Sequence, residues 1–280
     1  MQKIAEIIDD NTIHVYDLTQ FNIDAIMHSG QVFRYFESVN GYDVVVGNNF
    51  AEIIKEDNRA VIKCNNARFF WSYFDLDTNY NVIKEQLLKY HSIKKIFETS
   101  NAGGIRILRA EFIETVISFI VSANNNIKRF TKTLNQLCEQ FGTKLENGFF
   151  AFPTLEQLNN VTVSDFRALG CGYRSEHLVK AISQLGQPHM QMEKLCKLDN
   201  YELSKTLQTL FGVGQKVAFC VMLFCGDFHR LDLAPQDTWI IKALNQLPKE
   251  DKEILLNHKY AGVAQQYIFY YLQHLKKELN

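Results

Sequence analysis

The segment LQTLFGVGQKVAFCV, residues 207–221, determines the fold class of this 280-residue chain. We expect one helix to end near Phe211, a tight hairpin over residues 212–214, and a second helix to begin at about Gln215. Glycines permit positive φ and a close approach by a nucleic-acid backbone. The free amides of the hairpin and of the helix N-terminus suit a phosphate group. The spacing fits a helix-hairpin-helix, and a plain corner between two helices fits it equally well.

Lys216 lies in the first turn of the second expected helix, and the residues that follow it, Val217 to Cys225, are almost entirely apolar. A lysine in such a setting is unusual, because burying a charge is costly. Desolvation and the positive end of the helix dipole both favour the neutral amine that a nucleophilic lysine must supply. The alternative is a side chain that extends along the helix to solvent or to a DNA phosphate.

Asp237 occurs in the segment LAPQDTWI, residues 233–240. Pro235 disfavours helix for the residue before it, so Asp237 is well placed to cap the helix that follows. Capping alone accounts for an aspartate here. The chain can also run out along residues 215–224 and return, which would bring Asp237 beside Lys216. A lysine and a carboxylate at two helix starts, next to a phosphate-binding hairpin, predict chemistry on DNA.

The segments FGVGQKVAFCVMLF and HRLDLAPQDTW together resemble the helix-hairpin-helix DNA glycosylase superfamily, and the lysine indicates its bifunctional branch. Four further segments are similar to the 8-oxoguanine DNA glycosylase family: its core helix and Asn-rich turn, pocket strand, wedge loop and base-reading helix. They are GIRILRAEFIETVISFIVSANNNIKR (104–129), SGQVFRY (29–35), LGCGYR (169–174) and AGVAQQYIF (261–269). The matches lie in the family's order. Gln236 and Trp239 depart from the family's usual residues.

The resemblance implies that the enzyme flips a nucleotide out of the duplex, since the reacting atoms are inaccessible in the stack. Lys216 would attack the sugar C1′, expel the oxidised base and form a Schiff base that permits strand cleavage by β-elimination. Asp237 would stabilise the cationic transition state and orient Lys216. Gly212 and Gly214 would offer backbone amides to phosphate.

The resemblance also implies which residues recognise the base. The Gly30 carbonyl would accept the N7 proton that oxidation creates, Phe269 would stack on the ring, and Gln265 would contact the Watson–Crick edge. Without the resemblance, Gln265 reads as a surface glutamine and Phe269 as a core aromatic. Cys220 and Phe224 line the pocket wall or simply pack in the core.

Four residues are expected to fill the gap that a flipped guanine leaves: Asn124, Arg129, Tyr173 and Arg174. The two arginines would read the opposite cytosine, because a guanidinium can donate to both of its exposed acceptors. The alternatives are a helix-capping asparagine, solvent-facing arginines and a packed tyrosine.

The pattern of apolar residues predicts an α+β fold that is mainly α. Residues 1–77 form an N-terminal antiparallel β domain, and residues 78–280 form a two-lobed helical glycosylase body with the helix-hairpin-helix at about 201–226. The expected strands are Thr12–Leu18, Val32–Glu37, Tyr42–Val46, Phe50–Glu56 and Arg59–Cys64. The expected helices are Asn79–Tyr90, Arg109–Ala123, Ile127–Phe141, Thr154–Asn159, Ser175–Leu185, Asn200–Leu210, Gln215–Phe224, Asp237–Leu247, Glu250–Asn257 and Gly262–Lys277.

Composition restricts the other classes of function. The formal net charge of −1 gives no general affinity for nucleic acid, so a local patch must bind DNA. The six cysteines show no CxxC spacing and no four-cysteine cluster, so we expect neither metal nor cofactor. With no signal segment and no membrane span, we expect an intracellular monomer with reduced thiols, in the cytoplasm or nucleoid, or in the nucleus of a eukaryote. Its partner would be double-stranded DNA that contains oxidised guanine.

Two rival functions remain open. One is a glycosylase of the same superfamily with another damaged-base specificity. Its adenine and pyrimidine branches typically carry four cysteines near the C-terminus, where this chain has none, and its alkylation branch usually lacks the lysine. The other is a non-enzymatic DNA-binding module, which would leave the pair of Lys216 and Asp237 unexplained.

Overall fold

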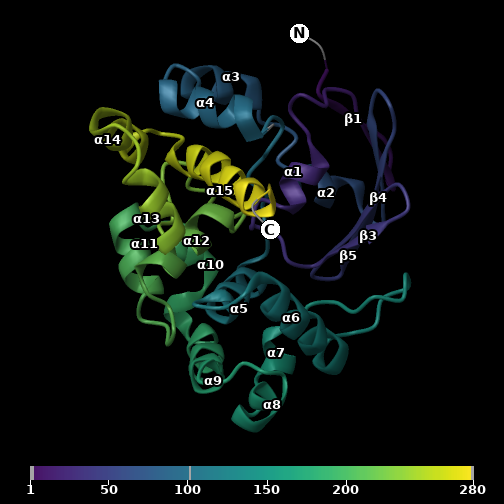
Figure 1. Ribbon diagram of the computed structural model, residues 1–280. Coiled ribbons are helices and arrows are strands. Elements are labelled where there is room, and N and C mark those ends of the chain that lie inside the picture. Colours follow the sequence, from purple (N-terminus) through teal and green to yellow (C-terminus); the bar gives the residue numbers. More distant parts are fainter. Residues whose placement is uncertain (1–2, 101, 279–280) are drawn as a thin grey trace. The chain divides into compact units, whose positions relative to one another are not determined.

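The computed structural model describes residues 3–100 and 102–278. These residues form one six-stranded antiparallel sheet near the N-terminus and fifteen α-helices, which confirms the mainly helical α+β class (Figure 1). The strands are β1 (Ala5–Asp9), β2 (Thr12–Val15), β3 (Tyr35–Ser38), β4 (Gly41–Val46), β5 (Asn49–Lys55) and β6 (Ala60–Cys64).

In the sequence, one helix lies between β2 and β3, and the other helices follow β6. They are α1 (Ile23–Met27), α2 (Ala67–Tyr73), α3 (Tyr80–Leu87), α4 (His91–Ser100), α5 (Phe112–Ser122), α6 (Ile127–Phe141), α7 (Leu155–Leu158), α8 (Val163–Ala168), α9 (Arg174–Leu185), α10 (Met192–Leu195), α11 (Asn200–Leu207), α12 (Gln215–Phe224), α13 (Thr238–Leu244), α14 (Lys249–Asn257) and α15 (Ala261–Glu278). No helix in the described ranges combines the length and the apolar character that crossing a membrane requires.

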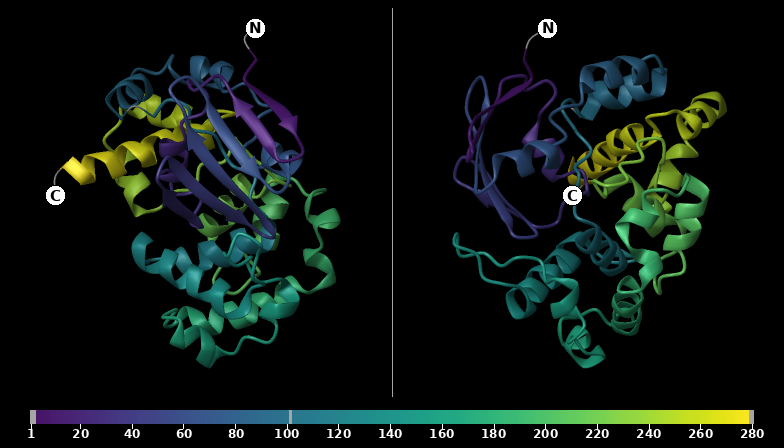
Figure 2. Two further views of the ribbon diagram at one scale, coloured as in Figure 1. Left: turned by 90° about the vertical axis from the view of Figure 1, so that its right-hand side faces the viewer. Right: turned by 180° about the vertical axis from the view of Figure 1, so that it is seen from behind.

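The sheet has the strand order β1-β2-β6-β5-β4-β3 (Figure 2, left). Its centre is apolar on one face, since Ile13 of β2 and Ile53 of β5 both lie opposite Ile62 of β6, and all three are fully buried. In β2 and in the middle of β5, buried residues alternate with exposed or partly exposed ones, which is the pattern of a half-buried strand.

One predicted strand was wrong at its start, because β3 begins at Tyr35 rather than at Val32. The preceding segment is buried but hydrogen-bonds through a side chain instead of a β-ladder. The Gln31 amide donates to the Arg106 carbonyl at 2.8 Å and accepts the Leu108 N–H at 2.8 Å. The segment before β3 is therefore tied to residues 106–108 through the Gln31 side chain and not through a β-ladder.

The chain divides into two compact units. The first comprises Met1–Val44, Ala51–Arg109 and Arg230–Asn280, and the second comprises Val45–Phe50 and Ala110–His229. In the first unit, α15 packs against α4 and α13. In the second, α5 packs against α12, α6 and α9, and α11 packs against α12. The predicted boundary at residue 77 stays a prediction.

Candidate active site

The hairpin between α11 and α12 is built around Gly212. Its φ of +81° is one that L side chains rarely adopt. A Cβ added there would lie only 3.1 Å from Cβ of His177 and 3.3 Å from Cγ2 of Ile120. Both the backbone conformation and the close neighbours therefore require glycine at this position.

Gly214 has a different role from Gly212. It is the N-cap of α12 with an extended backbone (φ −90°, ψ −179°), so positive φ is not the reason for this glycine. No side chain caps the first turn of α12, and a Cβ at Gly214 would meet no atom within 4 Å. Open space thus lies in front of a helix N-terminus whose amides need an acceptor, and this arrangement suits an anion.

Lys216 is half-buried on α12, and its neighbours Val217 and Ala218 are buried. Its Nζ lies 5.2 Å from the ring centroid of Phe119 on α5. Such a contact holds the amine over an apolar surface. Sequence reasoning did not single out Phe119. The nearly continuous apolar run of α5 predicts that this helix is buried, but it does not indicate which side chain lies beneath the lysine.

Phe224 and Cys220 are both buried, each with 3% of its surface exposed. The Phe224 ring stacks on that of Phe119, with centroids 5.5 Å apart and planes 11° apart. These contacts favour the core-packing alternative for Phe224. It therefore supports Lys216 through Phe119.

The segment expected to fill the gap in the duplex is anchored by Arg174. This side chain is only 7% exposed, so the solvent-facing alternative is wrong for it. Its guanidinium donates to the Ala123 carbonyl and, at 2.8 Å, to the Asn124 carbonyl. Asn124 has a φ of +50° and does not cap α6, because Asn126 does so. Arg174 thus stabilises a strained turn at the end of α5.

Arg129 and Tyr173 are the exposed members of this group. Arg129 donates weakly to the Gly170 carbonyl at 3.4 Å, and Tyr173 is 61% exposed, with the Arg174 guanidinium 4.5 Å from its ring centroid. The second unit therefore brings together the Asn124 turn and the loop of residues 169–174.

In the first unit, Gly30 lies against the ring of Phe269. Gly30 has a φ of +77°, and a Cβ there would be 2.5 Å from Cε1 of Phe269. Phe269 is half-buried, so its ring is not fully enclosed in the core. Glycine at this position allows the backbone, with its carbonyl, to approach the ring edge.

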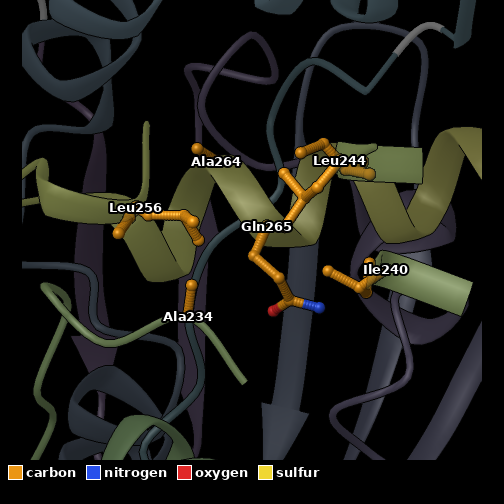
Figure 3. Close-up of a pocket in the computed structure, with 8 residues that line it drawn as sticks. Ala234, Ile240, Leu244, Leu256, Ala264 and Gln265 are labelled. Carbon is orange, nitrogen blue, oxygen red and sulfur yellow. The ribbon is translucent and has the colours of Figure 1, made fainter. Parts of the chain in front are cut away.

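Gln265 is 6% exposed, so the surface-glutamine alternative is wrong. Its Oε1 accepts a hydrogen bond from Nε2 of Gln266 at 3.1 Å. Figure 3 shows its amide beside Ile240 and Ala234, in a small apolar pocket that Leu244 and Leu256 also line. A buried amide among apolar groups is costly unless its polar atoms find partners.

Asp237 caps α13, as the sequence predicts, because its Oδ1 accepts the Ile240 N–H at 2.8 Å. Gln236 is exposed, and the side chain of Trp239 lies outside the described residues. Lys216 belongs to the second unit and Asp237 to the first. Their approach stays a prediction.

Two buried cysteines of the second unit, Cys171 and Cys225, are poor candidates for a nucleophile. Burial raises the pKa of the Cys171 thiol to about 11 and that of Cys225 to about 12, so both are neutral thiols near pH 7. Among the residues that the structure describes, no three His, Cys, Asp or Glu side chains are grouped to hold a metal.

Comparison with known proteins gives matches along most of the chain. Residues 14–116 match the 8-oxoguanine DNA glycosylase N-terminal domain, and residues 117–255 match the HhH-GPD superfamily of base excision DNA repair proteins. The chain is 30% identical over 265 residues to a Saccharomyces cerevisiae N-glycosylase/DNA lyase, covering 83% of this chain and 68% of the relative.

Two solved structures agree over nearly the whole chain. A structure of MBOgg1 with a low-affinity DNA ligand is 31% identical, with a TM-score of 0.88, covering 99% of this chain and 100% of that one. The Clostridium acetobutylicum 8-oxoguanine glycosylase/lyase, bound to double-stranded DNA with cytosine opposite 8-oxoG, is 31% identical, with a TM-score of 0.86 and coverage of 96% and 97%.

Proposed function

The chain belongs to the 8-oxoguanine DNA glycosylase family, and we propose that it excises 8-oxoguanine from DNA by attack of Lys216. It is a DNA glycosylase with AP lyase activity that binds double-stranded DNA. The observation that carries the Lys216 assignment is its position. The lysine is half-buried in the first turn of α12, directly after the hairpin, and no side chain caps the N-terminal amides of this helix.

The first chemical step joins the lysine to the sugar. Nζ of Lys216 attacks C1′ as the bond from C1′ to the base breaks, and the electron pair of that bond leaves with the base. The attached amine gives one proton to the departing base, the bond from C1′ to O4′ breaks, O4′ takes up a proton from water, and a protonated imine joins Nζ to C1′. Loss of a proton from C2′ expels the 3′ phosphate by β-elimination. Contact with Phe119 would hold the Lys216 side chain over an apolar surface at the start of α12.

Asp237 would stabilise the positive charge that develops on the sugar as the base departs. The hydrogen bond from Ile240 N–H fixes the orientation of this carboxylate. A carboxylate held in place before the reaction stabilises charge without reorganising during it.

Base recognition would use the first unit. The Gly30 carbonyl would accept the proton on N7 of the oxidised base, since unmodified guanine has no proton there. The half-buried Phe269 ring would stack on the base, and the Gln265 amide would exchange its bond with Gln266 for the Watson–Crick edge. In the second unit, Phe224 would support Lys216 through Phe119.

The opposite strand would be read by Arg129 and Arg174 while Tyr173 and Asn124 fill the gap, which predicts a preference for cytosine opposite the lesion. Gly212 and Gly214 would bind the phosphate. We further propose that the enzyme acts as a monomer without a metal, and that its place of work is chromosomal DNA, in the nucleoid or, in a eukaryote, the nucleus.

Borohydride trapping tests the nucleophile. The wild-type protein should become covalently linked to a duplex that contains 8-oxoguanine when borohydride reduces the imine. Lys216→Gln should lose both trapping and excision and still fold, whereas Lys194→Gln, a matched change at an exposed lysine on α10, should keep both. Normal excision by Lys216→Gln would refute the assignment.

A further inference from the structure

One stripe of helix α9 contacts the hairpin through His177, Lys180 and Gln184, to which the proposed function gives no role. Tyr173, at the N-cap of α9, and the helix residues His177, Lys180 and Gln184 are spaced by four, three and four positions, so they share one face. The last three contact residues 209–212, and Tyr173 lies in the loop of residues 169–174. This stripe therefore joins two segments that are both expected to touch DNA.

Gln184 binds the turn that links α11 to α12 at two points. Its Oε1 accepts the N–H of Phe211 at 2.9 Å, and its Nε2 donates to the carbonyl of Thr209 at 2.9 Å. Helix ends leave such backbone groups without partners inside the helix. One planar amide satisfies a donor and an acceptor two residues apart, and so fixes the direction in which the chain enters the hairpin.

His177 and Lys180 hold the tip of the same hairpin. The backbone of Gly212 fits so closely against His177 that a methyl group there would lie 3.1 Å from the histidine Cβ. Nζ of Lys180 lies 4.4 Å from the ring centroid of Phe211, which is 46% exposed. The exposed Phe211 at the entry to the hairpin is thus held by α9, next to the buried Val213.

The same face continues to the loop expected to enter the gap in the duplex. The ring of His177 meets that of Tyr173 edge to face, with centroids 5.8 Å apart and planes 80° apart. Arg174, the first residue of α9, binds the carbonyls of the Asn124 turn. One helix therefore sets the spacing between the hairpin, the loop and the turn.

We propose that Gln184 is a positioning residue for DNA binding, which holds the hairpin so that its amides face a phosphate at the correct distance from the loop of residues 169–174. This inference rests on the proposed phosphate-binding role of the hairpin. Gln184 acts through the backbone of Thr209 and Phe211. Loss of Gln184 therefore weakens the binding of DNA and leaves the rate of the chemical step unchanged once all of the DNA is bound.

The test compares Gln184→Met, which keeps the length and helix propensity of the side chain but removes both hydrogen bonds, with Gln187→Met. Gln187 lies just beyond α9, and its amide makes only a 3.5 Å contact with the Ser183 carbonyl. The probe for binding is a duplex with a tetrahydrofuran abasic analogue opposite cytosine. We expect Gln184→Met to raise Kd about tenfold, equivalent to about 1.4 kcal/mol. Single-turnover excision of 8-oxoguanine at saturating enzyme should be unchanged, and Gln187→Met should match the wild type in both assays.

An unchanged Kd would overturn the proposal, and so would a slower single-turnover rate at saturating enzyme, because Gln184 would then affect the chemical step. Hydrogen exchange gives a second test that does not depend on the methionine variant. The Phe211 amide should exchange slowly in the wild type and faster in Gln184→Ala, and rapid exchange in the wild type would show that Gln184 does not hold the turn. Failure of the wild type to be trapped by borohydride would instead count against the proposed function.

Discussion

Replacing Gly212 and Gly214 separately by alanine should separate the stability of the hairpin from its affinity for DNA. Gly212→Ala forces a side chain into a φ of +81° and places its Cβ 3.1 Å from His177. The left-handed backbone costs about 1–2 kcal/mol, and crowding adds about 1–3 kcal/mol. We therefore expect the free energy of unfolding to fall by about 2–5 kcal/mol in all.

Gly214→Ala is the matched control, because its backbone is extended and its Cβ would meet no atom within 4 Å. Alanine is a poorer N-cap than glycine, so the cost should stay below about 1 kcal/mol. The new methyl group would nevertheless stand in the space that a phosphate would enter. We expect this variant to retain its stability and to lose affinity for DNA.

Urea unfolding gives the stability of both variants, and titration with a duplex that carries a tetrahydrofuran abasic analogue gives their affinity. The predicted pattern is an unstable Gly212→Ala protein and a stable, weakly binding Gly214→Ala protein. Equal stability of the two variants would refute the strain argument. Wild-type affinity in Gly214→Ala would refute phosphate binding at the start of α12.

Three further predictions follow from the described contacts. Asp237→Asn should strongly lower the rate of excision in single-turnover measurements and leave the affinity for damaged DNA, measured by equilibrium titration, nearly unchanged. If the affinity falls as much as the rate, Asp237 is mainly a helix cap. Lesions opposite cytosine should be excised faster than lesions opposite adenine, and Arg129→Ala and Arg174→Ala should narrow this gap. Equal wild-type rates of excision opposite all four bases would contradict this reading of the opposite base. Arg174→Ala should also lower Tm, because it removes the hydrogen-bond donors to the Asn124 turn. Burial raises the pKa of the Cys225 thiol to about 12, so its thiolate becomes abundant only far above pH 8. Iodoacetamide at pH 8 should therefore modify the exposed Cys196 first, as mass spectrometry would show. Rapid labelling of Cys225 would show instead that its surroundings open.

Some elements with strong local signals were predicted correctly, whereas helices α1, α2 and α4 were not predicted. Helix α6 begins where expected because Asn126 caps it, and Phe130, Leu134 and Leu137 form its buried stripe. Strand β1 was missed, because only Ala5 is buried in it while Ile7 and Ile8 are exposed, so it lacks the alternation that reveals a strand. Helices α8 and α10 span six and four residues, too few to show a helical period.

Within the candidate site, too, residues that lie close together in the sequence were predicted and contacts between distant residues were not. Gly212 and Lys216 lie within one short segment, so local sequence was enough to select them. The contacts of Arg174 with Ala123 and of Gln184 with Phe211 join residues 51 and 27 positions apart. Such pairs depend on how helices pack, and no periodicity in one sequence reports which polar side chain will meet which carbonyl.

The uncapped start of α12 also bears on any attempt to make this protein more heat-resistant. Serine or aspartate at an N-cap stabilises a helix by about a few tenths of a kcal/mol relative to glycine. A laboratory selection for survival at high temperature would therefore favour these residues at position 214. The side-chain oxygen of either residue would accept hydrogen bonds from the same amides that a phosphate needs, and so would compete with DNA for the start of α12. Heat-selected populations should accumulate well-folded, inactive proteins that differ from the parent at this single glycine.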